Sequence, residues 1–78
     1  MDININIDYD NKYYIACSNK KGFKIIGYYT LEIAQIMFEE NKQFYDECKI
    51  GEIKGQVTIE NLFFDYMAKF RGKIWALQ

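Results

Sequence analysis

Residues 30–48, TLEIAQIMFEENKQFYDEC, form the longest helix-patterned stretch of this 78-residue chain. At 100° per residue, its apolar side chains fall on one arc and its acidic and amide side chains on the opposite arc. The apolar arc consists of Leu31, Ile33, Ala34, Met37, Phe38, Phe44, Tyr45 and Cys48. Thr30 suits the N-cap, Glu32 suits the positive end of the helix dipole, and Gly51 can end the helix. The stretch therefore predicts a long helix with one buried face.

Strand patterns precede this helix, at residues 2–9, 13–18 and 23–29. The first alternates strictly, which places Ile3, Ile5, Ile7 and Tyr9 on the face expected to be buried. The other two are rich in aromatic and β-branched residues. Short turns at 10–11 and 19–22 separate the three segments, and Gly22 is expected to be left-handed in the second turn. Sequential strands with short turns predict a three-stranded antiparallel meander.

The remaining residues predict a connection, a second helix and a tail. Residues 49–57 contain two glycines and no firm period, so we expect a connection there, with at most a short strand near Gln56. Thr58 suits the N-cap of a helix from Ile59 to about Arg71. The tail after Gly72 is too apolar to stay free of the core. The predicted fold is α+β, a single domain over 1–78: a three-stranded antiparallel meander packed against a long helix, followed by a second helix beside it and a short C-terminal strand or tail.

The stretch KYYIACSNKKGFKIIGYYTLEIAQIMFEE resembles two groups of DNA-binding domains. These are the ethylene-response-factor domains and the arm-binding domains of phage integrases, in which three strands precede a helix. Gly27, Tyr28, Thr30 and Ala34 stand where those domains have a glycine-aromatic pair, a threonine and an alanine. The resemblance implies a strand meander followed by a helix, and we use it as support for the fold alone.

Composition excludes several classes of protein. Half of the residues are hydrophobic and 18% are aromatic, so a packed core is expected rather than a disordered chain. No segment approaches the roughly 20 apolar residues of a membrane span, and no leader pattern is evident, so we expect a cytoplasmic protein without a membrane partner. Cys17 and Cys48 lack C-x-x-C spacing and the chain has no histidine, which favours buried reduced thiols over a zinc site.

No residue set predicts catalysis. Glu32, Glu39 and Asp46 recur every seven residues on the polar arc of the first helix, which is typical of a solvated face. Without histidine, the chain lacks the side chain best suited to proton transfer near neutral pH. We therefore expect no enzyme activity, no catalytic residue, no cofactor and no metal.

Apolar residues within polar arcs indicate an interaction surface. Ile36 interrupts the acidic arc of the first helix, and Phe64 interrupts the polar arc of the second. The expected partner-binding residues are Glu32, Ile36, Glu39, Glu40, Glu47, Phe64 and Trp75. Interfaces favour aromatic anchors, and the acidic field favours a basic partner. We expect a host protein, including one that binds nucleic acid, or a second copy of the chain.

Abundant Ile, Asn, Lys, Tyr and Phe without proline indicate AT-rich coding, as in a phage or mobile element. The sequence therefore favours a small non-enzymatic protein-binding protein that inhibits a host defence protein, as anti-CRISPR proteins do. The alternative is a DNA-binding module in which Lys20, Lys21 and Lys24 of the three-stranded sheet contact phosphates.

Overall fold

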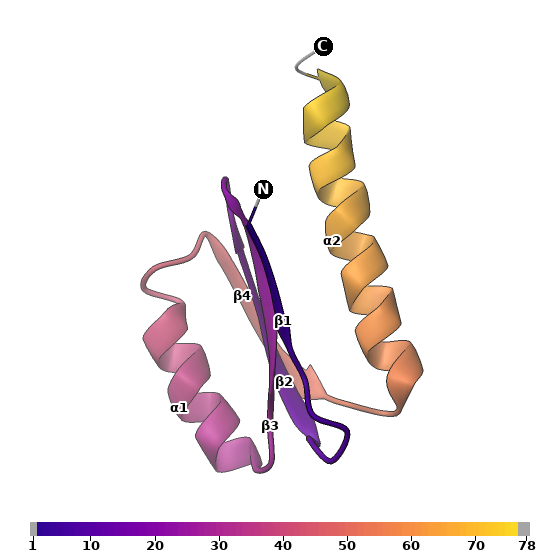
Figure 1. The fold of residues 1–78 in the computed structure, drawn as a ribbon. Coiled ribbons are helices and arrows are strands. Elements are labelled where there is room, and N and C mark those ends of the chain that lie inside the picture. The colour runs from indigo at the N-terminus through magenta and orange to yellow at the C-terminus, as the bar shows by residue number, and fades with distance from the viewer. Residues whose placement is uncertain (1, 77–78) are drawn as a thin grey trace.

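The computed structural model describes the backbone of residues 2–76 and the side chains of residues 2–69. Within these residues it contains a four-stranded mixed sheet with one helix on each face (Figure 1). The elements are, in chain order, β1 (Asp2–Asn6), β2 (Tyr13–Asn19), β3 (Gly22–Tyr28), α1 (Leu31–Asn41), β4 (Glu47–Glu52) and α2 (Gln56–Ala76). The predicted α+β class is confirmed, whereas the predicted meander is matched only in part.

The sheet order is β1-β3-β2-β4. β2 and β3 form the expected antiparallel hairpin, but β1 pairs in parallel with β3 instead of forming a hairpin with β2. The loop between β1 and β2 passes the end of β3, because the Lys12 amide donates to the Tyr28 carbonyl at 3.0 Å, and Asn11 closes this loop as a compact turn. The Asn11 side chain accepts a hydrogen bond from the Asp8 backbone amide at 2.7 Å, and the Asn11 backbone amide donates to the Asp8 carbonyl at 3.0 Å. The loop thus connects β1 and β2 across β3.

Gly22 serves a different purpose from the one predicted. Gly55 has the only positive φ among the glycines described, so Gly22 is not left-handed. A Cβ on Gly22 would lie 1.7 Å from the Asp2 carbonyl oxygen. Glycine at this position therefore lets the start of β1 approach β3. The turn before it is held by the Asn19 side chain, which accepts from the Lys21 and Gly22 amides at 2.8 and 3.1 Å.

The first helix is shorter than its sequence pattern predicts. Thr30 is its N-cap, as expected, but α1 ends at Asn41, and residues 47–52 form the edge strand β4 against β2. Asn41, the last residue of α1, is buried, and its side chain makes two hydrogen bonds. Its Oδ1 accepts from Lys24, and its Nδ2 donates to the Met37 carbonyl at 2.7 Å. Gly51 lies within β4 rather than ending a helix. Pairing with β2 thus overrides the helical period of residues 44–48.

The second helix is longer than predicted and does not lie beside the first helix. α2 begins at Gln56 and continues through Gly72 to Ala76, so residues 73–76 are helical and form no strand or folded-back tail. It also packs on the sheet face opposite α1 rather than beside it (Figure 1). Consecutive residues of β3 show this directly, since Phe23 stacks on Tyr66 of α2 while Lys24 bonds to Asn41 of α1.

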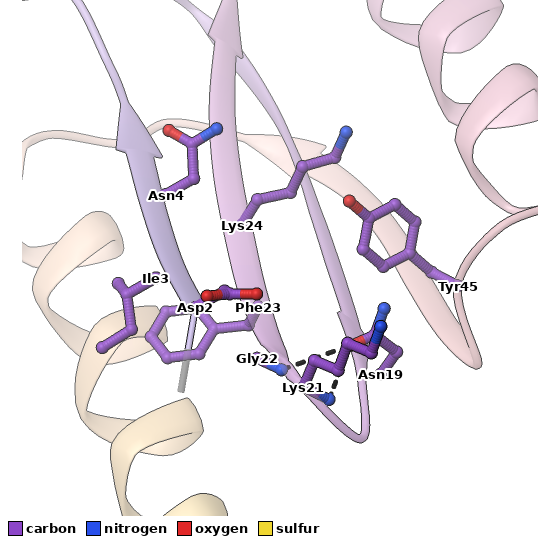
Figure 2. A pocket seen from close by; sticks show the side chains of 9 residues that line it. All are labelled: Asp2, Ile3, Asn4, Asn19, Lys21, Gly22, Phe23, Lys24 and Tyr45. Atoms are coloured by element: carbon purple, nitrogen blue, oxygen red, sulfur yellow. Dashed lines mark hydrogen bonds between the residues drawn. The ribbon is translucent and has the colours of Figure 1, made fainter.

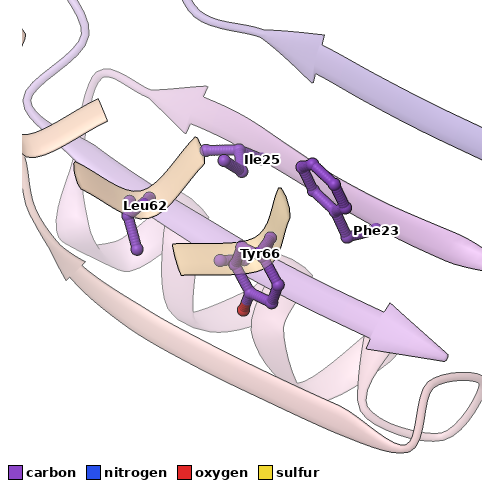
Figure 3. Packing of buried hydrophobic residues seen from close by; sticks show 5 residues of the cluster. Phe23, Ile25, Leu62 and Tyr66 are labelled. Atoms are coloured by element: carbon purple, nitrogen blue, oxygen red, sulfur yellow. The ribbon is translucent and has the colours of Figure 1, made fainter. Parts of the chain in front are cut away.

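The core on the α2 side joins three elements (Figure 3). It consists of Ala16, Phe23, Ile25, Leu62 and Tyr66. The rings of Phe23 and Tyr66 stack at 4.9 Å between centroids with 13° between planes. Ile3 and Ile5 of β1 share this face through pairing with Phe23 and Ile25, yet they remain 43% and 42% exposed. Tyr9, predicted on the same buried face, is fully exposed. The helix α2 therefore covers β2 and β3 more completely than β1.

Candidate interaction surface

The orientation of α1 is fixed by two buried residues and by its cap. Ala34 and Asn41 are the buried residues of the helix, and Thr30 Oγ1 accepts from the Ile33 amide at 3.3 Å. Because these two buried residues lie seven positions apart on one side, the opposite side of the helix faces away from the sheet. Ile33 and Ile36 lie toward that outer side and are 45% and 59% exposed.

Three glutamates flank the two isoleucines. Within an arc of about 120°, α1 presents Glu32, Ile33, Ile36, Glu39 and Glu40, which we call the acidic-apolar face. All five residues are exposed. Exposed apolar residues rimmed by charged ones are typical of protein contact sites, whereas an entirely solvated helix face would be polar throughout.

The charge of this face is only partly neutralised. Lys42 Nζ lies 2.8 Å from Glu39 Oε2, but both side chains are more than half exposed, so this ion pair contributes little to stability. The pKa of the neighbouring Tyr28 hydroxyl is raised, first by burial, then by Cys17 and by the negative charge of Glu40. The acidic-apolar face thus combines an apolar centre with a negative field.

The structure divides the predicted partner-binding residues into two groups. Ile36, Glu32, Glu39 and Glu40 stay together on α1. Phe64 is 65% exposed but belongs to α2, on the other side of the sheet. Glu47 of β4 also lies on that side, because it pairs with Lys69 of α2. The Trp75 side chain lies outside the described residues.

Sequence reasoning missed Ile33 as a surface residue. It was assigned to the buried arc because that arc was centred using Phe44, Tyr45 and Cys48. Since α1 ends at Asn41, those three residues have no place on its helical wheel, and the buried arc is narrower than predicted. The spacing of Ile33 and Ile36, three residues apart, was the signal that could have shown an exposed apolar pair.

The three candidate lysines do not share one open sheet face. Lys24 points toward the α1 side, donates to Asn41 and lies 4.9 Å from the centroid of the Tyr45 ring. Lys24 and Tyr45 line a hollow of about 520 Å³ at the starts of β1 and β3. Figure 2 shows the two side chains next to each other. Lys20 and Lys21 form the turn that precedes β3. Asp2 also lines the hollow, so its charge is mixed.

Among the residues that the structure describes, no group of three or more histidine, cysteine or acidic side chains is arranged to hold a metal ion. None of the described helices has the length and hydropathy needed to cross a membrane.

The chain matches no protein-family model, and comparison with curated proteins and with solved structures found no significant similarity.

Proposed function

We propose that this chain is a small non-enzymatic binding protein whose acidic-apolar face docks on a basic, partly apolar surface of another protein. The observation that carries the proposal is the exposure of Ile33 and Ile36 side by side between three glutamates. Burying two isoleucines supplies affinity, whereas the surrounding carboxylates steer a partner of opposite charge. A basic protein surface therefore fits this face better than an acidic or neutral one.

A nucleic-acid-binding protein is the partner class that this chemistry favours. Such proteins expose basic surfaces for phosphates, and a helix carrying Glu32, Glu39 and Glu40 presents negative charges that can take the place of phosphates there. The composition, rich in Ile, Asn and Lys and without proline, supports an origin in a phage or mobile element. We extend the proposal to an inhibitor of a host defence protein that acts by occupying its surface, as anti-CRISPR proteins do.

The test compares two matched variants as bait for a lysate of a low-GC bacterium. Ile36→Asp places a charge at the centre of the acidic-apolar face, whereas Phe64→Asp makes a similar change at a similarly exposed position on α2. A captured protein that is lost with Ile36→Asp and retained with Phe64→Asp uses the proposed face. With that protein purified, Ile36→Asp should weaken binding by about 30-fold, the effect of losing an interface anchor worth about 2 kcal/mol.

Two further measurements distinguish the mode of binding. Reversing the charge of Glu39 and Glu40 should mainly slow association, since rim charges act on the encounter. Added duplex DNA should compete with the chain for a nucleic-acid-binding partner. Equal capture by wild type and Ile36→Asp would contradict the proposed face. If the partner is a second copy of the chain, sedimentation of the purified wild type should show a dimer, and Ile36→Asp should dissociate it.

The alternative of a sheet that binds DNA receives less support from the geometry. Helices lie over both faces of the sheet, and Lys24 is engaged by Asn41 and Tyr45. Binding of duplex that weakens steeply with salt, and that is lost on changing Lys20 and Lys21 to glutamate, would favour this alternative instead.

A further inference from the structure

Cys17 and Cys48 lie directly opposite each other on the antiparallel strands β2 and β4. Extended by one residue, this register places Lys12 opposite Ile53, and the Ile53 amide donates to the Lys12 carbonyl at 2.8 Å. Lys12 and Ile53 thus stand at a hydrogen-bonded position of the ladder, although the Lys12 amide itself donates to the Tyr28 carbonyl. Hydrogen-bonded and non-hydrogen-bonded pairs alternate along such a ladder. Because Cys17 is five positions from Lys12, the two cysteines form a non-hydrogen-bonded pair.

This type of pair brings two side chains close together. Residues opposite each other at a non-hydrogen-bonded site have Cα atoms about 4.5 Å apart, within the roughly 4.4–6.8 Å that disulfides span. Cys48 is also one of the groups that raise the pKa of the Cys17 thiol, after burial, so the two side chains interact. Both cysteines are free in the structure. Their positions thus suit a covalent bond that they do not yet make.

We propose that Cys17 and Cys48 form a site of reversible oxidation, at which a low-molecular-weight disulfide such as oxidised glutathione converts the two thiols into a cross-strand disulfide. The site does not depend on the proposed partner surface, although the bond would close the segment that contains β3 and α1. It would also fasten the edge strand β4 to β2 beneath α1.

The reaction balances as two exchange steps. The Cys48 thiolate attacks one sulfur of oxidised glutathione, the glutathione disulfide bond breaks, and one glutathione leaves as a thiolate that takes up a proton. The Cys17 thiolate then attacks the Cys48 sulfur of the mixed disulfide, and the second glutathione leaves in the same way. Two protein thiols are oxidised and one glutathione disulfide is reduced to two thiols.

Exposure sets the order of these steps. Cys48 is half-buried on an edge strand, whereas Cys17 is fully buried, so the oxidant reaches Cys48 first. Burial, followed by the effects of Cys48, raises the pKa of the Cys17 thiol to about 12. Cys17 is consequently protonated at neutral pH, and the second step should accelerate as the pH rises.

The experiment treats the folded protein with oxidised glutathione, then unfolds it and alkylates the remaining thiols with iodoacetamide. Intact-mass spectrometry should show a monomer that has lost two hydrogen atoms and takes up no alkyl group. Dithiothreitol should restore both thiols, and the oxidised protein should melt at a higher temperature, because a cross-link restricts the unfolded chain. Peptide mapping should join Cys17 to Cys48.

Single variants separate the two steps. Cys17→Ser should stop at a mixed disulfide with one glutathione on Cys48, whereas Cys48→Ser should gain none because Cys17 is shielded. Glutathione on Cys17 in the latter variant would contradict the order of attack. The proposal is overturned if wild type keeps two alkylatable thiols, accumulates only the mixed disulfide, or forms the bond between two chains. These three outcomes need no variant, so they stand even if a serine variant unfolds.

Discussion

Replacing Gly22 with alanine should detach the start of β1 from β3. The new Cβ would lie 1.7 Å from the Asp2 carbonyl oxygen, whereas Cβ atoms essentially never approach a neighbour within 3.0 Å. The contact would be about 1.3 Å too short, and the atom that it meets belongs to the backbone, which cannot rotate away as a side chain can. Movement of Asp2 would break the 2.8 Å hydrogen bond from its amide to the Lys21 carbonyl and shift Ile3 away from the α2 side.

The cost follows from what β1 contributes. Ile3 and Ile5 are a little more than half buried. Full burial of an isoleucine stabilises by about 1.5–3 kcal/mol, so the two side chains together supply about 2–3 kcal/mol. For a chain of this length, total stability is of the order of 4–12 kcal/mol. Gly22→Ala should therefore lower the melting temperature by about 10 °C or more.

Thermal melting followed by circular dichroism measures this loss, and amide exchange locates it. Exchange should accelerate at residues 3–6, ahead of the residues in β2. Gly51→Ala is the matched control, because the three atoms nearest to a Cβ there all belong to the Tyr14 side chain, at 2.5–2.7 Å, and none to the backbone. Tyr14 packs against the core, so this control also lowers the melting temperature, but it should leave exchange at residues 3–6 unchanged. Unchanged exchange at residues 3–6 in Gly22→Ala would refute the parallel pairing of β1 with β3.

Other substitutions and pH test the packing. Leu62→Ala should lower the free energy of unfolding by about 2–5 kcal/mol in a urea titration, because Leu62 is a buried contact of α2 with the sheet. Phe64→Ala should change stability little, because Phe64 is exposed. Equal losses by the two variants would contradict this assignment. Asn41→Ala should cost about 1–3 kcal/mol in the same titration, since it removes two part-buried hydrogen bonds, one of them from the charged Lys24 ammonium, and a neutral result would contradict this. Burial raises the pKa of Tyr66 from 10.0 to about 12, so the unfolded chain releases this proton at lower pH than the folded one. The Tyr66 contribution to stability should be complete below pH 10 and be lost between pH 10 and about 12, whereas that of Cys17, whose pKa is raised from 9.0 to about 12, should begin to be lost from pH 9. Tyr66→Phe should flatten this alkaline decline, and an unchanged decline would assign it to other groups, including Cys17, whose pKa is also raised.

Local patterns were sufficient for part of the candidate surface. Ile36 and the three glutamates beside it were identified from their places on the helical wheel, and the structure places them together on α1. The helical pattern places Phe64 on the polar arc of the second helix without deciding whether it is covered, and in the structure it is 65% exposed. What the patterns could not supply was the relation between the two helices, which lie on opposite faces of the sheet. Helical periodicity describes which side of a helix is apolar, but not which surface covers it.

The sequence by itself determined the elements whose signals are local. Thr30 caps α1 through its own side chain, and β2 and β3 form a hairpin because two segments rich in aromatic and β-branched residues flank a short turn closed by Asn19. Tertiary structure alone decided the rest. β1 pairs with residues about 20 positions away, and β4 pairs with residues of β2 that lie 29 to 39 positions away, at the expense of the helical pattern in residues 44–48. Such partners are chosen by packing and backbone hydrogen bonds between distant segments, and residue spacing within one segment carries no information about them.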